Sequence, residues 1–160
     1  MTLDFTRTTP SLSRMLMLAI PAGLIAAVVF EILALAIAPM LLGQAMKPEL
    51  LVGALSQTVL GVQISTGAAW LGHLLAGIVL FPMGYALFAR GFAGLAWPLA
   101  AVVYAVLLWL FAQGVLAPIA GRPVMLGFTA YTWASLLVHV IYVLTVAVVL
   151  NRLAHRPGPV

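Results

Sequence analysis

The chain has 160 residues, of which 65% are hydrophobic and 6% are charged. Soluble globular domains carry roughly 25% charged residues, so this composition excludes a water-soluble domain and predicts a membrane protein whose surroundings are the lipid bilayer. The sequence contains no cysteine, which excludes disulfides and thiolate chemistry, and its Lys and Arg residues form no cluster that could follow the backbone of a nucleic acid.

The hydrophobic pattern predicts an all-α fold, a single membrane domain in which four transmembrane helices form a bundle. The first predicted helix covers about residues 15–42 and contains Glu31. A short apolar segment over about residues 48–62 follows it. This segment is too short to span a bilayer, so we expect it to form an interfacial helix between the first two spans.

The remaining predicted spans cover about residues 68–89, 94–117 and 124–150. His73 lies near one end of the second span and Pro82 near the other. We expect Pro82 to kink this helix, because proline removes one backbone hydrogen bond and crowds the preceding turn.

The distribution of cations predicts the orientation of the bundle. With the N-terminus inside, the inner side would carry Arg7, Arg14, Arg90, Arg152 and Arg156, and the outer side Lys47 and Arg122. This excess of inner cations follows the positive-inside rule. We therefore predict a multi-pass protein of a bacterial-type inner membrane with both termini in the cytoplasm.

Ionisable side chains occur inside the predicted spans at Glu31, His73 and His139. At about 1.5 Å per residue from the inner cations, Glu31 and His73 lie about 25 Å deep and His139 about 20 Å deep. Such groups are costly in lipid and usually face the interior of a bundle. We therefore expect the three side chains to converge.

Further polar groups are placed to join this cluster. Ser135, His139 and Tyr142 share one face of the last predicted helix, and Tyr104 could add a hydroxyl from the third. Small residues share the face of Glu31 and would allow a neighbouring helix to approach closely; they are Gly23, Ala27, Ala34 and Ala38.

Three functions fit such a cluster. We predict first a hydrogen-bonded network in a non-enzymatic accessory or structural subunit, either a homo-oligomer or part of a larger membrane complex. The first alternative is an electron-transfer protein in which His73 and His139 are axial ligands of a b-type haem, or bind a metal together with Glu31. The second is a proton or ion pathway through Glu31.

Two segments, GHLLAGIVLFPMGYALFARG (residues 72–91) and LLVHVIYVLTVAVVL (residues 136–150), are joined through LAPIAGR. This arrangement resembles the YagU-like group of small bacterial inner-membrane proteins of unknown function. The resemblance implies that His73 and His139 correspond to recurrent histidines of that group. Val143 stands where the resemblance implies a glycine after Tyr142. The resemblance implies no particular activity.

Overall fold

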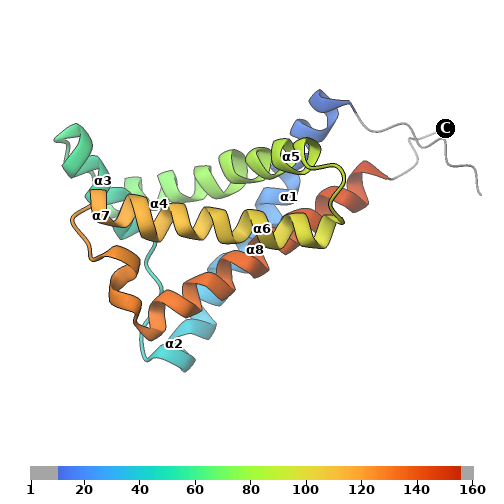
Figure 1. Cartoon of the computed structure of the whole chain (residues 1–160). Coiled ribbons are helices and arrows are strands. Elements are labelled where there is room, and N and C mark those ends of the chain that lie inside the picture. The colour runs from blue at the N-terminus through green and yellow to red at the C-terminus, as the bar shows by residue number, and fades with distance from the viewer. Residues whose placement is uncertain (1–10, 156–160) are drawn as a thin grey trace, which may run out of the picture.

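The computed structural model of the protein describes residues 11–155 and is all-α (Figure 1). Within these residues, four helical spans are long and apolar enough to cross a membrane. They are Leu12–Leu42, Thr66–Gly91, Trp97–Ile119 and Ala130–Ala154. The short helix α3 (Glu49–Leu60) lies between the first two spans, which confirms the predicted fold class.

The spans before the last one are each divided into several helical elements. These are α1 (Leu12–Ile32), η1 (Leu33–Ile37) and α2 (Ala38–Leu42); α4 (Thr66–Leu75), η2 (Ala76–Leu80) and α5 (Phe81–Gly91); and α6 (Trp97–Leu110), η3 (Phe111–Leu116) and α7 (Ala117–Ile119). The last span is the single helix α8 (Ala130–Ala154), which begins later than the pattern indicates. The preceding turn η4 (Val124–Phe128) is separate, because positive φ angles at Met125, Leu126 and Gly127 interrupt a continuous helix.

A π-helical segment precedes a proline in each divided span. The segments η1, η2 and η3 end with a backbone hydrogen bond from an N–H to the carbonyl five residues earlier. In each span the residue that follows the donor of this bond is a proline, namely Pro39, Pro82 or Pro118. Because proline has no N–H, the next carbonyl of each series, that of Ala34, Gly77 or Gln113, receives no further bond of this kind.

Two of these carbonyls, those of Gly77 and Ala34, accept hydrogen bonds from other parts of the chain. The Tyr142 hydroxyl of α8 donates to the Gly77 carbonyl. The Met46 N–H, in the connection before α3, donates to the Ala34 carbonyl at 3.0 Å. A proline that interrupts one helix therefore creates an acceptor for a tertiary contact.

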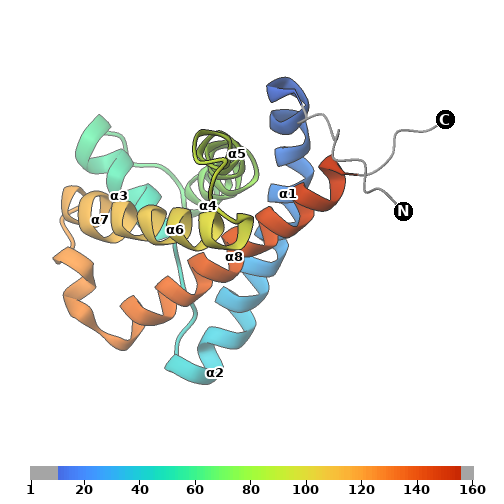
Figure 2. The ribbon, with the colours of Figure 1, turned by 45° about the vertical axis from the view of Figure 1, so that its right-hand side comes forward.

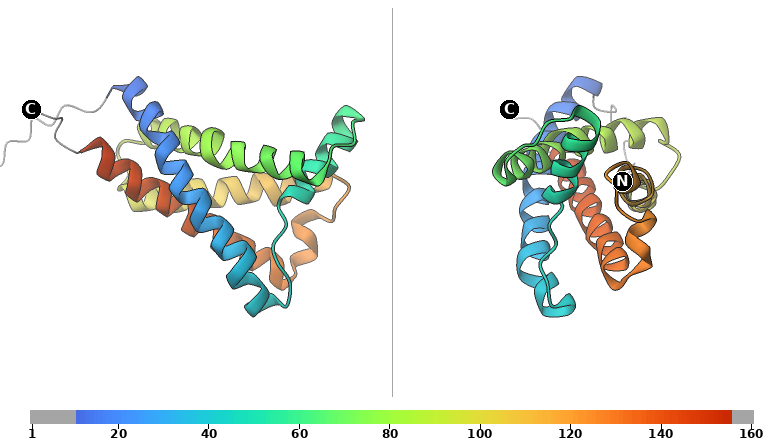
Figure 3. Two further views of the ribbon diagram at one scale, coloured as in Figure 1. Left: turned by 180° about the vertical axis from the view of Figure 1, so that it is seen from behind. Right: turned by 90° about the vertical axis from the view of Figure 1, so that its left-hand side faces the viewer.

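The spans pack closely at one end of the bundle and separate at the other. Helix α8 packs against both α1 and α6, and η2 packs against α1 (Figure 3). At the end where α1 begins and α8 ends, small buried side chains allow this close packing, among them Ala19, Ala22, Ala26, Ala101, Ala105 and Ala147. Toward the end that carries α2, α3 and α7, helices α1 and α8 diverge from α4 and α6 (Figure 1 and Figure 2).

The outer faces of the spans expose large apolar side chains, as expected of helices surrounded by lipid. Examples are Met17, Leu35, Leu80 and Leu137. Helix α1 begins, and α5 and α8 end, at the closely packed end of the bundle (Figure 1). Of the residues behind the orientation prediction, Arg7 and Arg156 lie outside the described residues. Which end of the bundle faces the cytoplasm stays a prediction.

Gly23 marks a point where α1 and the second span touch. A Cβ atom at this position would overlap the Ile78 carbonyl and the Pro82 ring. We expect Gly23→Ala to lower the free energy of unfolding by about 1–3 kcal/mol, because neither neighbour is a flexible side chain. Gly114→Ala is the matched control, since a Cβ there meets nothing within 4 Å. Equal unfolding midpoints of the two variants in detergent would contradict this packing.

The role of Pro82 can be separated from that of Tyr142 by a double-mutant cycle. Tyr142→Phe should lower the free energy of unfolding by about 0.6–1.7 kcal/mol in the wild-type background, because the Gly77 carbonyl loses its donor. In Pro82→Ala the restored N–H can reach that carbonyl, so the same substitution should cost less. Thr132→Val, which removes a hydroxyl that donates to the Met125 carbonyl at 2.6 Å, should change the free energy of unfolding by the same amount in both backgrounds. Additive unfolding free energies for Pro82 and Tyr142 would refute the coupling.

Candidate functional site

A cavity of about 160 Å³ lies among the spans in the part of the bundle where they diverge. Its polar lining comes from every span and consists of Glu31, His73, Gln113, Ser135, His139 and Tyr142, with Lys47, Arg122 and Tyr131 toward its mouth. The rest of the lining is apolar. The structure thus places the three predicted ionisable residues, together with Ser135 and Tyr142, around one cavity.

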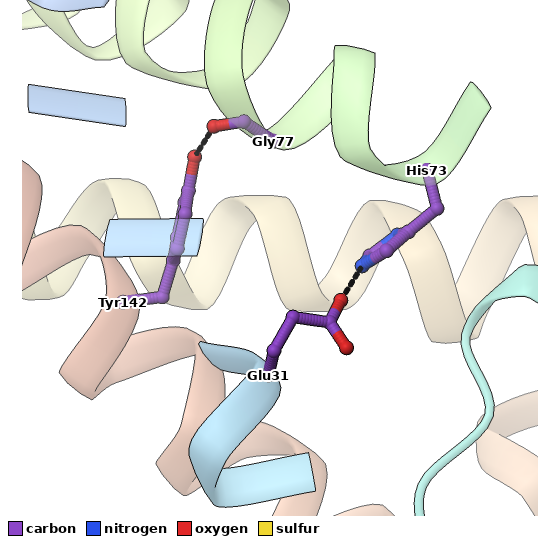
Figure 4. Close-up of polar contacts among 4 residues, drawn as sticks. All are labelled: Glu31, His73, Gly77 and Tyr142. Atoms are coloured by element: carbon purple, nitrogen blue, oxygen red, sulfur yellow. Dashed lines mark hydrogen bonds and ion pairs between the residues drawn. The ribbon is translucent and has the colours of Figure 1, made fainter. Parts of the chain in front are cut away.

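On the cavity lining, Glu31 of α1 and His73 of α4 point toward each other (Figure 4). Glu31 Oε1 lies 3.9 Å from His73 Nε2, and the two side chains are 20% and 16% exposed. They are therefore partly accessible, and the structure does not show a fully buried charged cluster. Glu31 Oε1 itself is buried and has no hydrogen-bond partner among residues 11–155.

Tyr142 forms the floor of the cavity. Its hydroxyl donates to the Gly77 carbonyl (Figure 4), and the edge of its ring meets Phe30, with ring centroids 6.3 Å apart. Phe30 also contacts the His73 ring, at a centroid distance of 5.2 Å. Below Tyr142 the core consists of packed apolar side chains, so the cavity ends at this level.

Gln113, Ser135 and His139 form a hydrogen-bonded chain along the wall made by η3 and α8. Gln113 Nε2 donates to Ser135 Oγ at 3.1 Å, and the Gln113 side chain is buried. His139 Nδ1 lies 2.7 Å from the Ser135 carbonyl oxygen. Because a carbonyl only accepts, Nδ1 carries the proton, and Nε2 of the neutral ring is left as an acceptor. Gln113 Oε1 is buried and, in the described part of the chain, has no hydrogen-bond partner.

Helix α3 covers the wide end of the cavity. Its residues Leu51, Val52 and Leu55 line the cavity, and the helix packs against α4 and α7. Beside it lies a shallow hollow that shares Lys47, Arg122, Leu126 and Tyr131 with the cavity lining. The approach to the cavity from this end therefore passes two cationic side chains.

Not every predicted site residue joins the cavity. The Tyr104 hydroxyl donates to the Phe81 carbonyl at 3.1 Å, and Tyr104 does not line the cavity. Within residues 11–155, no group of three or more His, Asp or Glu side chains is arranged to hold a metal ion. Glu31, His73 and His139 thus surround one space without forming a three-ligand set.

Sequence reasoning did not assign Gln113 to the site, although Gln113 lines the cavity. The position of Gln113 relative to Pro118 could have indicated its role. Gln113 precedes this proline by five residues and therefore lies in the turn that a π segment distorts. This signal becomes visible once Pro39 and Pro82 show the same relation to Ala34 and Gly77.

No curated protein and no solved structure matches the chain. The sequence model of a family of unknown function, DUF6789, matches residues 13–159. The match extends over almost all of the described chain, including each residue of the cavity. The likeness to the YagU-like group stays an expectation. The chain therefore belongs to the family of unknown function DUF6789.

Proposed function

We propose that this protein is a non-enzymatic membrane subunit that binds a small lipophilic molecule carrying hydrogen-bond donors in the cavity among its helices. The main support is that two buried acceptors facing the cavity, Glu31 Oε1 and Gln113 Oε1, lack hydrogen-bond partners within the described residues. A buried polar atom without a partner costs about 1–3 kcal/mol. A ligand that donates to these oxygens removes that cost.

The size of the cavity limits the ligand to about one six-membered ring. Its volume of about 160 Å³ is close to the roughly 150 Å³ of an engineered protein cavity that binds benzene. Pockets for drug-sized ligands are larger, at about 300–1,000 Å³. The apolar walls include Phe30, Leu108 and Phe111, which suit an apolar ring.

The closed floor favours binding over conduction. The cavity extends from the Lys47 and Arg122 end to Tyr142, and beyond Tyr142 the residues Val143, Val146 and Ala147 are buried in the core. A proton or ion pathway through Glu31 would require this floor to open. The presence of Glu31 on the lining of a cavity that stops at the packed core supports a binding role for this residue.

The proposal predicts that a ring with a donor binds better than the same ring without one. In nanodiscs, saturating phenol should raise the unfolding free energy by about 2 kcal/mol more than toluene, since only phenol can donate to a buried acceptor. Gln113→Leu should reduce this difference. Gln57→Leu, an exposed position on α3 outside the cavity, should preserve it. Equal effects of the two compounds on the wild-type protein would contradict the proposal.

Electron transfer by a haem is the second candidate function, and one observation favours it. His139 donates its Nδ1 proton to a backbone carbonyl, as histidines that bind a metal through Nε2 commonly do. His73 lines the same cavity. A porphyrin is much larger than one six-membered ring, however, so α1 and α8 would have to separate further from α4 and α6.

An absorption spectrum separates the two functions. Because the cavity is too small for a porphyrin, we expect no Soret band from protein purified from haem-replete cells and incubated with excess haem. A Soret band that is lost in His73→Ala and in His139→Ala, but kept in the matched variant His155→Ala, would establish axial ligation. That outcome would replace the binding proposal with a redox function.

A further inference from the structure

We infer that the ligand of the cavity is a hydroquinone, a single ring with hydroxyl groups at opposite ends. This inference rests on the proposed function and specifies its ligand. It follows from the number of acceptors that lack donors, from the helices that carry them, and from the volume and walls of the cavity. The same ring chemistry occurs in lipid-soluble quinols and in free diphenols.

The unsatisfied acceptors require more than one donor. Glu31 Oε1 belongs to α1 and Gln113 Oε1 to η3, and both are buried in the described structure without a hydrogen-bond partner. The Gln113 side chain is only 7% exposed, and its amide nitrogen already donates to Ser135. Its oxygen is therefore an acceptor that a ligand can satisfy. A single hydroxyl hydrogen satisfies one acceptor, so two hydroxyls are needed.

The apolar part of the cavity lining suits a flat ring. Phe30, Leu108 and Phe111 supply apolar contact area, and Phe30 is held in place by its contacts with the rings of His73 and Tyr142. A benzene-sized space leaves little room for a flexible spacer between the donors. Hydroxyls at opposite ends of one rigid ring can reach two different helices, whereas adjacent hydroxyls point to one side.

The same geometry predicts discrimination between the reduced and the oxidised ring. A hydroquinone donates two hydrogens, but a benzoquinone of nearly the same shape carries only acceptor oxygens. In the cavity those oxygens would face Glu31 Oε1 and Gln113 Oε1, and the buried acceptors would stay unpaired. We therefore expect binding of the reduced form and rejection of the oxidised form.

The test is calorimetric titration of the full-length protein in phosphatidylcholine nanodiscs under anaerobic conditions, with empty nanodiscs as the blank. The probes are hydroquinone, benzoquinone, resorcinol, catechol and phenol. Hydroquinone should bind about tenfold tighter than phenol and at least tenfold tighter than benzoquinone, because each added donor pairs with a buried acceptor. Resorcinol and catechol should bind more weakly than hydroquinone.

Variants connect the affinity to the two oxygens. Gln113→Leu and Glu31→Leu should each weaken hydroquinone binding about tenfold. Their matched controls Gln57→Leu and Glu49→Leu lie outside the cavity and should bind normally. A thermal midpoint checks the folding of each variant. If a cavity variant does not fold, the ratio of hydroquinone to benzoquinone affinity in the wild-type protein still decides the question.

The outcomes separate this inference from the proposed function. If benzoquinone, resorcinol, catechol or phenol binds as tightly as hydroquinone, the inference is overturned. The proposed function stays intact in that case as long as ring binding depends on a hydrogen-bond donor. Binding of none of these compounds would overturn both and assign water alone to the cavity. If hydroquinone binds, a decyl-substituted hydroquinone distinguishes its source: retained binding supports a membrane quinol, and lost binding supports a free diphenol.

Discussion

The hydrogen bond from the Tyr142 hydroxyl to the Gly77 carbonyl is the contact on which the geometry of the cavity depends. It fixes the height of α8 relative to the second span, and other site residues lie about one turn further toward the wide end. His73 precedes Gly77 by four residues and His139 precedes Tyr142 by three, which corresponds to about 5 Å along each helix. One contact thus sets both imidazoles at the same depth.

This contact exists because a helix is locally incomplete. In an uninterrupted α-helix the Gly77 carbonyl would be occupied by an N–H of its own chain, and the Tyr142 hydroxyl would need another acceptor. The π segment η2 and Pro82 leave that carbonyl available. The first span uses the same arrangement to hold the connection before α3, through Ala34 and Met46. In a membrane, where water cannot satisfy a free carbonyl, the donors to Gly77 and Ala34 come from other parts of the chain.

The sequence predicts the elements that depend on hydrophobic length, and it places the residues whose depth can be counted from a helix end. The spans and α3 follow from apolar runs, and Glu31, His73 and His139 face one cavity because charged groups avoid lipid. The small residues on the Glu31 face, Ala27, Ala34 and Ala38, are buried as their spacing indicates.

The remaining features depend on hydrogen-bond register and side-chain direction, which periodicity does not encode. The π segments shift the face of every residue after them, so the place of Gln113 in the wall could not be read from a regular helix. Tyr104 turns to the Phe81 carbonyl because an acceptor lies within its reach there. The late start of α8 depends on positive φ angles at Met125 and Leu126, which residues of this type rarely adopt.

The divergence of the spans toward the end that carries α2, α3 and α7 (Figure 1) has a consequence for the surrounding bilayer. The protein takes up more cross-sectional area at that end than at the end where α1 begins and α8 ends. In a bilayer, such a shape would displace more lipid from one leaflet than from the other. We therefore expect the separation of the helices to respond to the curvature of the host membrane.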